Sequence, residues 1–193
     1  MRKRSLWAMA LVMVCLFLAA SCSRDKEPAE LAIKGVEEAL NAAKGEIAKY
    51  VPDQLKSLEA AVKGAKEKFE KKEYTEALNA AKDLPGKVKE AAAAAAAKKA
   101  ELTKGWEAVS AELPKMVEEI KAKVEALGKA KKLPAGVDKA KLEGAKAGLG
   151  ELTQGWADAE NAFKGGNLSA ALAKANELKG KAGALMAALE PTK

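Results

Sequence analysis

The sequence has no histidine, and its 193 residues include only two cysteines and eight aromatic side chains. Without histidine the chain lacks the commonest general base and the commonest zinc ligand. Carboxylates are numerous, but the pairs Glu37–Glu38 and Glu118–Glu119 stand among lysines, as on a solvated helix surface. No serine lies in a Gly-x-Ser-x-Gly pattern, and no glycine-rich phosphate loop or calcium loop occurs. We therefore predict that the protein is not an enzyme and has no catalytic, metal-binding or cofactor-binding residues.

An apolar run near the N-terminus is too short to cross a membrane. It covers residues 6–20 and follows three basic residues at positions 2–4, whereas a membrane-spanning helix needs about 20 apolar residues. Two alanines and a serine, residues 19–21, then precede Cys22. This order resembles a bacterial lipoprotein signal with its lipobox. The alternatives are an ordinary secretory signal with an incidental cysteine, and a single uncleaved membrane helix.

The resemblance to lipoproteins implies how the chain is processed. Residues 1–21, which include Cys15, would be removed, and Cys22 would carry a diacylglyceryl group on its thiol and an acyl chain such as palmitate on its amine. Residues 22–28 would form the lipidated start and a short tether. Aspartate directly after the cysteine retains such proteins at the inner membrane, and this chain has Ser23 there. We therefore expect a lipid-anchored protein at the periplasmic face of the outer membrane.

The positive charge of the chain lies in its last third. The net charge of +7 falls to +4 without the signal, because residues 1–21 carry three basic side chains and no acidic one. Residues 23–128 then have 20 basic and 20 acidic side chains, and residues 129–193 have 11 and 7. Nucleic-acid modules usually combine a dense basic stripe with aromatic side chains, and the aromatic residues here are spread singly. We predict no nucleic-acid partner, and weak attraction of the C-terminal part to anionic headgroups or wall polymers stays open.

Composition and periodicity predict long helices. The chain has 44 alanines, and alanine and lysine are good helix formers and poor strand formers. Apolar positions alternate three and four residues apart, as in Ile33, Val36, Leu40, Ala43 and Ile47, which is the spacing of a coiled-coil seam. Short breaks between helices favour antiparallel neighbours. The predicted fold class is all-α: an elongated antiparallel helical bundle with coiled-coil-like seams.

Prolines and glycines mark the expected ends of the helices. Breaks are expected at residues 51–53, 72–73, 85–86, 133–136 and 165–167, with a new helix starting near Lys87. We expect a first helical unit over residues 29–100 and a second over residues 101–190. Four glycines interrupt a helix of the second unit, at Gly144, Gly148, Gly150 and Gly155. Either a neighbouring helix approaches these backbones closely or this region is loosely ordered.

Two pairs of segments in the chain are similar to each other. Residues 69–87 align without a gap with residues 163–181, and Glu-Leu-Thr-x-Gly-Trp occurs at residues 101–106 and 151–156. The offsets of 94 and 50 differ, so no single period covers the chain. We interpret the first pair as a duplicated helical hairpin, which makes the second unit partly a degenerate copy of the first. Chance similarity in a sequence rich in alanine, lysine and leucine is the alternative for the second pair.

The stretch 48–84 combines aromatic, proline and alanine positions in one pattern: Tyr50, Pro52, Leu55, the alanines near 60–65, Tyr74, Ala77 and Ala81. With this pattern, residues 30–100 resemble a family of uncharacterised alanine-rich helical envelope lipoproteins, known only as a domain of unknown function. The resemblance implies an exported, helical and lipid-anchored protein. It implies no particular activity.

The sequence thus predicts a non-catalytic envelope lipoprotein that presents a helical bundle in the periplasm as a spacer, scaffold or docking surface. Its partners would be the membrane, through the lipid anchor, and another envelope protein or the cell wall. One alternative is a chaperone-like binder of unfolded or acidic clients. Another is a peptidoglycan tether through Lys193, because the murein lipoprotein attaches through the amine of its terminal lysine; the Tyr-Arg-Lys ending of that protein is absent here.

Overall fold

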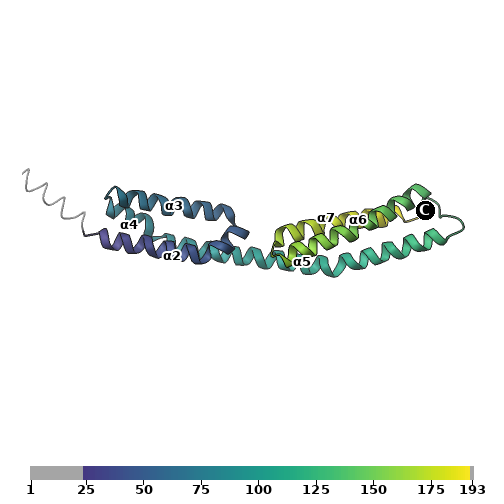
Figure 1. The fold of residues 1–193 in the computed structure, drawn as a ribbon, viewed down its shortest axis with the longest axis horizontal. Helices are drawn as coiled ribbons and strands as arrows, with labels where there is room; N and C mark the ends of the chain where they lie inside the picture. The colour runs from purple at the N-terminus through teal and green to yellow at the C-terminus, as the bar shows by residue number, and fades with distance from the viewer. Residues whose placement is uncertain (1–23, 192–193) are drawn as a thin grey trace, which may run out of the picture. The chain divides into compact units, whose positions relative to one another are not determined.

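The computed structural model describes residues 24–191, and helices make up 87% of the structure, with no strand in the described part. The all-α fold class and the helical bundle are therefore confirmed. Six helices follow one another in the described residues (Figure 1): α2 Lys26–Tyr50, α3 Pro52–Glu70, α4 Tyr74–Lys82, α5 Leu84–Lys129, α6 Lys139–Lys164 and α7 Leu168–Ala188.

The chain divides into two compact units between Lys98 and Lys99, a point inside α5. The described part of the first unit holds α2, α3, α4 and the beginning of α5. The second unit holds the rest of α5 with α6 and α7. Each unit is thus a set of helices around its own apolar core, and the two are described in turn.

In the first unit, α2 and α3 are antiparallel and in a fixed register. Lys44 Nζ lies 2.6 Å from Glu59 Oε1, and Glu37 pairs with Lys66. Seven residues forward on α2 correspond to seven residues back on α3, as the 3.5-residue repeat of a coiled-coil seam requires. Beneath these ion pairs lies a core to which α2, α3 and the beginning of α5 each contribute one stripe of residues: Val36, Leu40, Ile47, Leu55, Leu58, Val62, Leu84, Val88, Ala91 and Ala95.

The third helical layer of the first unit is made by α4 and the beginning of α5 together. Only Asp83 separates them, and the buried positions keep the three-and-four spacing across the break: Ala77, Ala81, Leu84, Val88, Ala91 and Ala95. The expectation that Pro85-Gly86 ends a helix and that the next starts near Lys87 was wrong. Pro85 lies in the first turn of α5, where its missing N–H leaves no hydrogen bond unmade.

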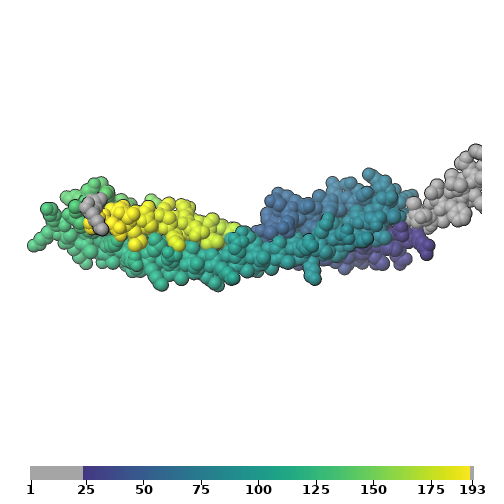
Figure 2. All heavy atoms as spheres, turned by 180° about the vertical axis from the view of Figure 1, so that it is seen from behind, coloured from purple at the N-terminus to yellow at the C-terminus, as the bar shows by residue number. Residues whose placement is uncertain are grey.

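In the second unit, α5 and α7 run parallel, and α6 runs antiparallel to both. Lys179 Nζ lies 2.6 Å from Glu112 Oε2. Eleven residues further along the chain in each case, Lys123 Nζ of α5 lies 3.6 Å from Oε1 of Glu190, which lies two residues beyond the end of α7, so the two segments keep the same register. Figure 2 shows α7, in yellow, lying along the teal surface of α5. The core includes Val109, Leu113 and Ile120 of α5, Leu152 of α6 and Leu178 of α7.

The connection between α5 and α6, residues 130–138, is the longest loop of the described chain. Gly136 has a φ of 86°, and Val137 is buried at 5% exposure, which fixes the loop against the helices. The carboxylate of Asp138 accepts a hydrogen bond of 2.8 Å from the backbone N–H of Lys141 and so caps α6. The turn expected at residues 133–136 falls within this loop.

Candidate functional site

The two residues predicted to carry function, Cys22 and Lys193, lie outside the described residues. The structure does show where the helices begin relative to Cys22. Helix α2 starts at Lys26, so three residues of sequence separate it from that cysteine. The expected tether over residues 22–28 therefore includes three residues that are already helical.

An aromatic stack joins α5 to α6 in the second unit. The ring of Trp106 is stacked on Trp156, with centroids 5.2 Å apart, and on Phe163, with centroids 4.7 Å apart. Trp156 and Phe163 are seven residues apart on α6, so they lie two turns apart on the same face. Trp106 is 6% exposed and belongs to the core. The stack is a packing feature that fixes the register of α5 against α6.

The repeated Glu-Leu-Thr-x-Gly-Trp motif has the same packing role on α5 and on α6. Its leucines, Leu102 and Leu152, are buried. A Cβ at either glycine would lie 2.7 Å from a leucine Cδ2 of α7: Gly105 from Leu172, and Gly155 from Leu178. Each motif therefore presents a tryptophan to the facing helix and a close-approach surface to α7.

Two of the four interior glycines of α6 are close-approach positions. A Cβ at Gly148 would lie 2.7 Å from Leu185 Cδ1, and Gly155 lies under Leu178 as described. Gly144 and Gly150 have no such neighbour within 4 Å. The sequence left open whether a neighbouring helix approaches these glycines closely or the region is loosely ordered. At Gly148 and Gly155 the structure shows the close approach, and the neighbouring helix is α7.

The two segments 94 residues apart form the same backbone turn. At the first turn, the N–H of Glu73 donates to Lys68 O at 3.0 Å and that of Lys72 to Phe69 O at 2.9 Å. At the second turn, the N–H groups of Asn167 and Gly166 donate in the same way to Ala162 O and Phe163 O, both at 2.9 Å. The φ angle is positive at Lys72 (65°) and at the corresponding Gly166 (77°).

Buried positions extend this correspondence over both units. With an offset of 94, buried residues of the first unit match buried residues of α6 and α7: Leu58 and Leu152, Ala65 and Ala159, Ala77 and Ala171, Ala81 and Ala175, Leu84 and Leu178. With an offset of 73, buried residues of α2 match those of α5: Ile33 and Trp106, Val36 and Val109, Leu40 and Leu113, Ile47 and Ile120. The offset grows from 73 to 94 between the two sets, so the α5–α6 hairpin is 21 residues longer than the α2–α3 hairpin.

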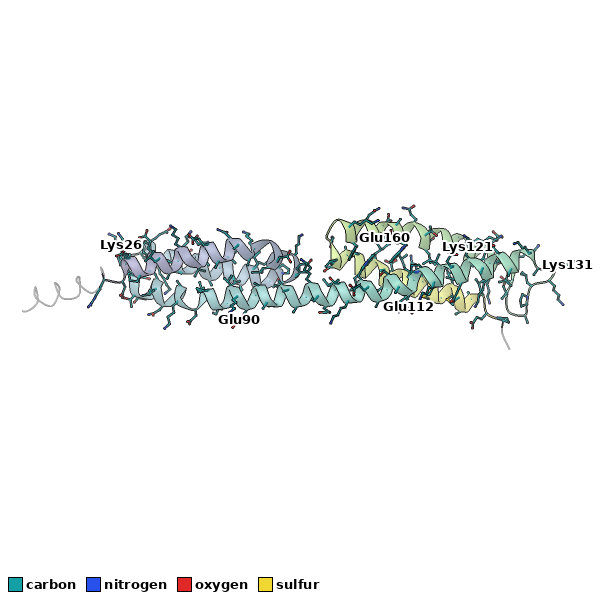
Figure 3. All side chains as sticks on the ribbon, turned by 90° about the horizontal axis from the view of Figure 1, so that it is seen from below. Lys26, Glu90, Glu112, Lys121, Lys131 and Glu160 are labelled. Atoms are coloured by element: carbon teal, nitrogen blue, oxygen red, sulfur yellow. The ribbon has the colours of Figure 1, made fainter. Side chains whose placement is uncertain are left out.

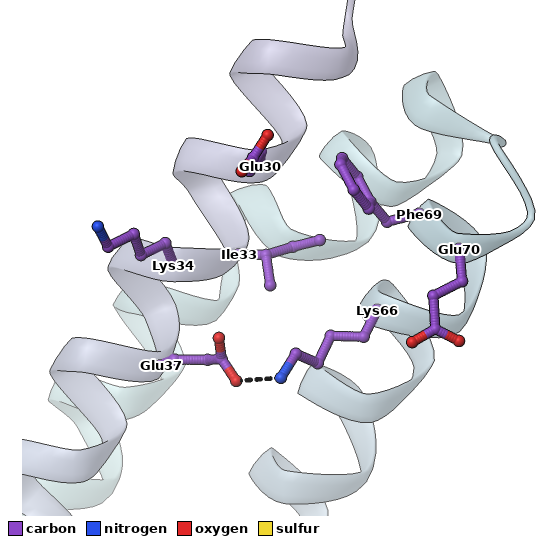
Figure 4. A pocket seen from close by; sticks show the side chains of 7 residues that line it. All are labelled: Glu30, Ile33, Lys34, Glu37, Lys66, Phe69 and Glu70. Atoms are coloured by element: carbon purple, nitrogen blue, oxygen red, sulfur yellow. Dashed lines mark hydrogen bonds and ion pairs between the residues drawn. The ribbon is translucent and has the colours of Figure 1, made fainter.

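A shallow groove lies between α2 and α3 near their ends in the first unit (Figure 4). Ile33 and Phe69 face its interior, and the ion pair between Glu37 and Lys66 closes one end. Further charged side chains stand at its edge: Glu30, Lys34 and Glu70. The groove is a gap between helices with an apolar floor and a charged rim of both signs. It contains no nucleophile activated by a neighbouring base.

The charges of the described residues lie at the surface. No polar or charged side chain in residues 24–191 is buried, and no three of the described His, Cys, Asp or Glu side chains gather into a group that could hold a metal ion. The pKa of Glu177 is lowered because its carboxylate accepts a hydrogen bond from Lys181 and lies near Lys174. Among the described helices none is long and apolar enough to cross a membrane.

The α5–α6 hairpin tip gathers an excess of positive charge. We use this name for residues 129–141, which carry five exposed lysines and one aspartate: Lys129, Lys131, Lys132, Asp138, Lys139 and Lys141. Figure 3 shows Lys131 at the outer end of this hairpin, pointing away from the helices. The sequence placed the positive charge in the last third of the chain but did not locate this tip. The signal was present as lysines on both sides of Pro134 and Gly136.

Comparison of the chain with protein-family models, curated proteins and solved structures gives no match. The resemblance of residues 30–100 to alanine-rich envelope lipoproteins therefore stays a prediction that depends on the residues named for it.

Proposed function

We propose that the protein is a non-catalytic envelope lipoprotein, and that its helical units act at the periplasmic face of the outer membrane as a spacer, scaffold or docking surface. The observation that carries the proposal is the position of Cys22. It follows a lipobox-like sequence, and the first helix of the described residues begins only four residues later, at Lys26. Such an arrangement suits a chain that is folded directly beside its anchor.

The short link between Cys22 and α2 limits how far the first unit can lie from the membrane. An extended chain spans at most about 3.6 Å per residue, so the four residues from Cys22 to Lys26 span at most about 14 Å. Buried methylene groups contribute about 0.8 kcal/mol each, and more than one acyl chain makes anchoring stable rather than reversible. An acylated Cys22 would thus keep the N-terminal end of α2 within about one and a half helix diameters of the lipid surface.

The construction of both units supports a structural role. Their described cores contain apolar side chains alone, and ion pairs such as Lys44–Glu59 and Lys179–Glu112 link neighbouring helices at the surface. A seam of this kind holds helices in register and leaves the outer faces available for contacts with other envelope components. We therefore favour a spacer or scaffold over the chaperone-like alternative. This choice depends on the expected lipid anchor, the short link between Cys22 and α2, and the paired helical units.

Replacement of each cysteine separately tests the anchor. We expect Cys22→Ser to abolish incorporation of labelled palmitate and to release the protein from membranes washed with carbonate. The matched control is Cys15→Ser, which lies in the segment expected to be removed and should change neither result. An unmodified N-terminus in native wild-type protein, measured by mass spectrometry, would contradict the proposal.

The residue after the cysteine tests the location. If the chain follows the sorting rule that its signal resembles, Ser23→Asp moves the protein from the outer to the inner membrane, as measured by density-gradient separation of the two membranes. Ser23→Thr serves as the control and should leave the distribution unchanged. Equal distributions for wild type and Ser23→Asp would contradict the outer-membrane assignment.

Attachment to peptidoglycan through Lys193 stays a separate prediction. It requires that lysozyme digestion changes the mass or solubility of the protein, and that deletion of Lys193 removes this change. A digestion-independent mass in wild-type cells would exclude the covalent tether and leave the lipid anchor unaffected.

A further inference from the structure

The α5–α6 hairpin tip differs in its charge from the rest of the second unit taken together. Residues 129–141 carry five basic side chains and one acidic one, whereas the rest of residues 99–191 carries 10 basic and 12 acidic ones. All five lysines are exposed. The excess positive charge of the unit is therefore concentrated on one loop and the helix ends beside it.

The lysines of this tip are not used for internal ion pairs. Within residues 24–191, no ion pair includes Lys129, Lys131, Lys132 or Lys139. Lys141 donates a hydrogen bond of 2.6 Å to the carbonyl oxygen of Gly136, inside the tip itself. In the body of the unit, by contrast, lysines such as Lys123, Lys179 and Lys181 pair with glutamates.

The tip is also a feature of one unit and not of the other. The corresponding hairpin of the first unit is 21 residues shorter, and a single residue, Val51, joins its helices. Between residues 46 and 56 that hairpin carries two basic and two acidic side chains. The longer hairpin of the second unit thus brings with it a positive charge that the first unit does not have.

The loop holds its lysines on an ordered, convex support. Val137 is buried, Asp138 caps α6, and the hydrogen bond from Lys141 to Gly136 closes the turn. Figure 2 shows the green atoms of the tip at the edge of the second unit. A convex end with several separated ammonium groups can contact a flat anionic surface with many of them at once.

We propose that the α5–α6 hairpin tip binds the anionic headgroups of a phospholipid surface. Lysine ammonium groups near such a surface each strengthen binding about fivefold. Residues 129–141 contain no aromatic side chain on which bases would stack, which disfavours single-stranded nucleic acid. The half-buried Leu133 and Pro134 add apolar surface beside the lysines, which suits the boundary between headgroups and acyl chains.

Vesicle co-sedimentation tests the proposal on the mature chain with Cys22→Ser, which retains every described helix and lacks the acyl groups. We expect this protein to bind vesicles of phosphatidylethanolamine and phosphatidylglycerol, and not vesicles of phosphatidylcholine. Binding should disappear near 1 M salt, because the Debye length falls to about 3 Å. Because the anchor is absent, the result is independent of whether Cys22 is acylated.

The variant Lys131→Gln/Lys132→Gln should weaken binding to the anionic vesicles about 25-fold, from two lysines at about fivefold each. The matched control is Lys87→Gln/Lys89→Gln, which removes two exposed lysines of α5 in the first unit and should change binding about twofold or less. Helical circular dichroism and the unfolding midpoint should be unchanged in both variants.

Three results would overturn the proposal. The first is an equal loss of binding in the tip variant and the control, which would indicate general charge attraction. The second is equal binding of the parent protein to anionic and phosphatidylcholine vesicles. The third is tip-dependent sedimentation with purified cell-wall polymer and none with vesicles, which would assign the tip to the wall instead of the lipid.

Discussion

At the scale of single residues, glycines decide how α7 packs. Gly105, Gly148 and Gly155 each lie under a leucine of α7, at a distance that admits a Cβ only if the leucine shifts. Gly150, on the same helix as Gly155, has no such neighbour. An interior glycine weakens a helix by up to about 1 kcal/mol relative to alanine. This cost is offset at the close-approach positions by the leucine contacts that it permits.

Alanine substitutions at Gly150 and Gly155 of α6 should therefore have different effects on stability. Gly150→Ala should raise the free energy of unfolding by about 0.5–1 kcal/mol, because helix propensity improves and nothing is displaced. Gly155→Ala should be less stable than Gly150→Ala by about 1–3 kcal/mol, because its Cβ overpacks against the buried Leu178. Urea unfolding followed by tryptophan fluorescence measures both. Equal stabilisation by the two substitutions would contradict the close approach of α7.

The aromatic stack gives a second prediction at this scale. Trp106→Ala should lower the free energy of unfolding by about 3–5 kcal/mol, because it leaves a cavity between Trp156 and Phe163. Trp106→Phe keeps a ring in that place and should lose less than half as much. Thermal unfolding followed by circular dichroism compares the two. Similar losses for both variants would show that the stacked ring has no special role.

At the scale of elements, the two turns at residues 71–73 and 165–167 have the same backbone conformation but different residues. Both need a left-handed backbone at the same place, where the first has Lys72 and the second Gly166. A residue with a Cβ pays about 1–2 kcal/mol for that conformation, and glycine does not. The sequence revealed the pair through its shared Phe, Ala and Leu positions. The positive φ of Lys72 was not visible there, because lysine is not a typical residue for such a turn.

Exchange of these residues should shift stability in opposite directions. Lys72→Gly should raise the free energy of unfolding by about 1 kcal/mol, because it removes the strain at φ 65°. Gly166→Ala should lower it by about 1 kcal/mol or more, because it introduces the same strain. Chemical denaturation of both variants provides the measurement. Destabilisation by Lys72→Gly would contradict a left-handed turn at this residue.

At the scale of the whole molecule, the chain is a pair of units with separate cores. The buried cluster of the second unit begins at Trp106, and those of the first end at Ala95, so no residue belongs to both. Without residues 1–21, which include Trp7, the two units also carry different spectroscopic probes. Tyr50 and Tyr74 are the tyrosines of the chain and lie in the first unit, and Trp106 and Trp156 lie in the second.

This separation predicts that core mutations act mainly on their own unit. In the mature chain, Leu58→Ala should lower the stability of the first unit by about 2–5 kcal/mol and shift the tyrosine-detected transition. The tryptophan-detected transition should move less. Leu152→Ala, the corresponding position of the second unit, should show the reverse. Equal shifts of both transitions in both variants would show that the units unfold together.

The sequence alone determined the helices and their apolar seams, because helix propensity and the three-and-four spacing depend on residues within a few turns of one another. The spacing through Val36, Leu40 and Ile47 predicted a buried stripe, and the structure buries all three. Tertiary structure alone decided which helices face one another. It placed Leu178 over Gly155 and Lys179 beside Glu112. Those neighbours depend on the register between helices, which is a property of the packed core and not of any single segment.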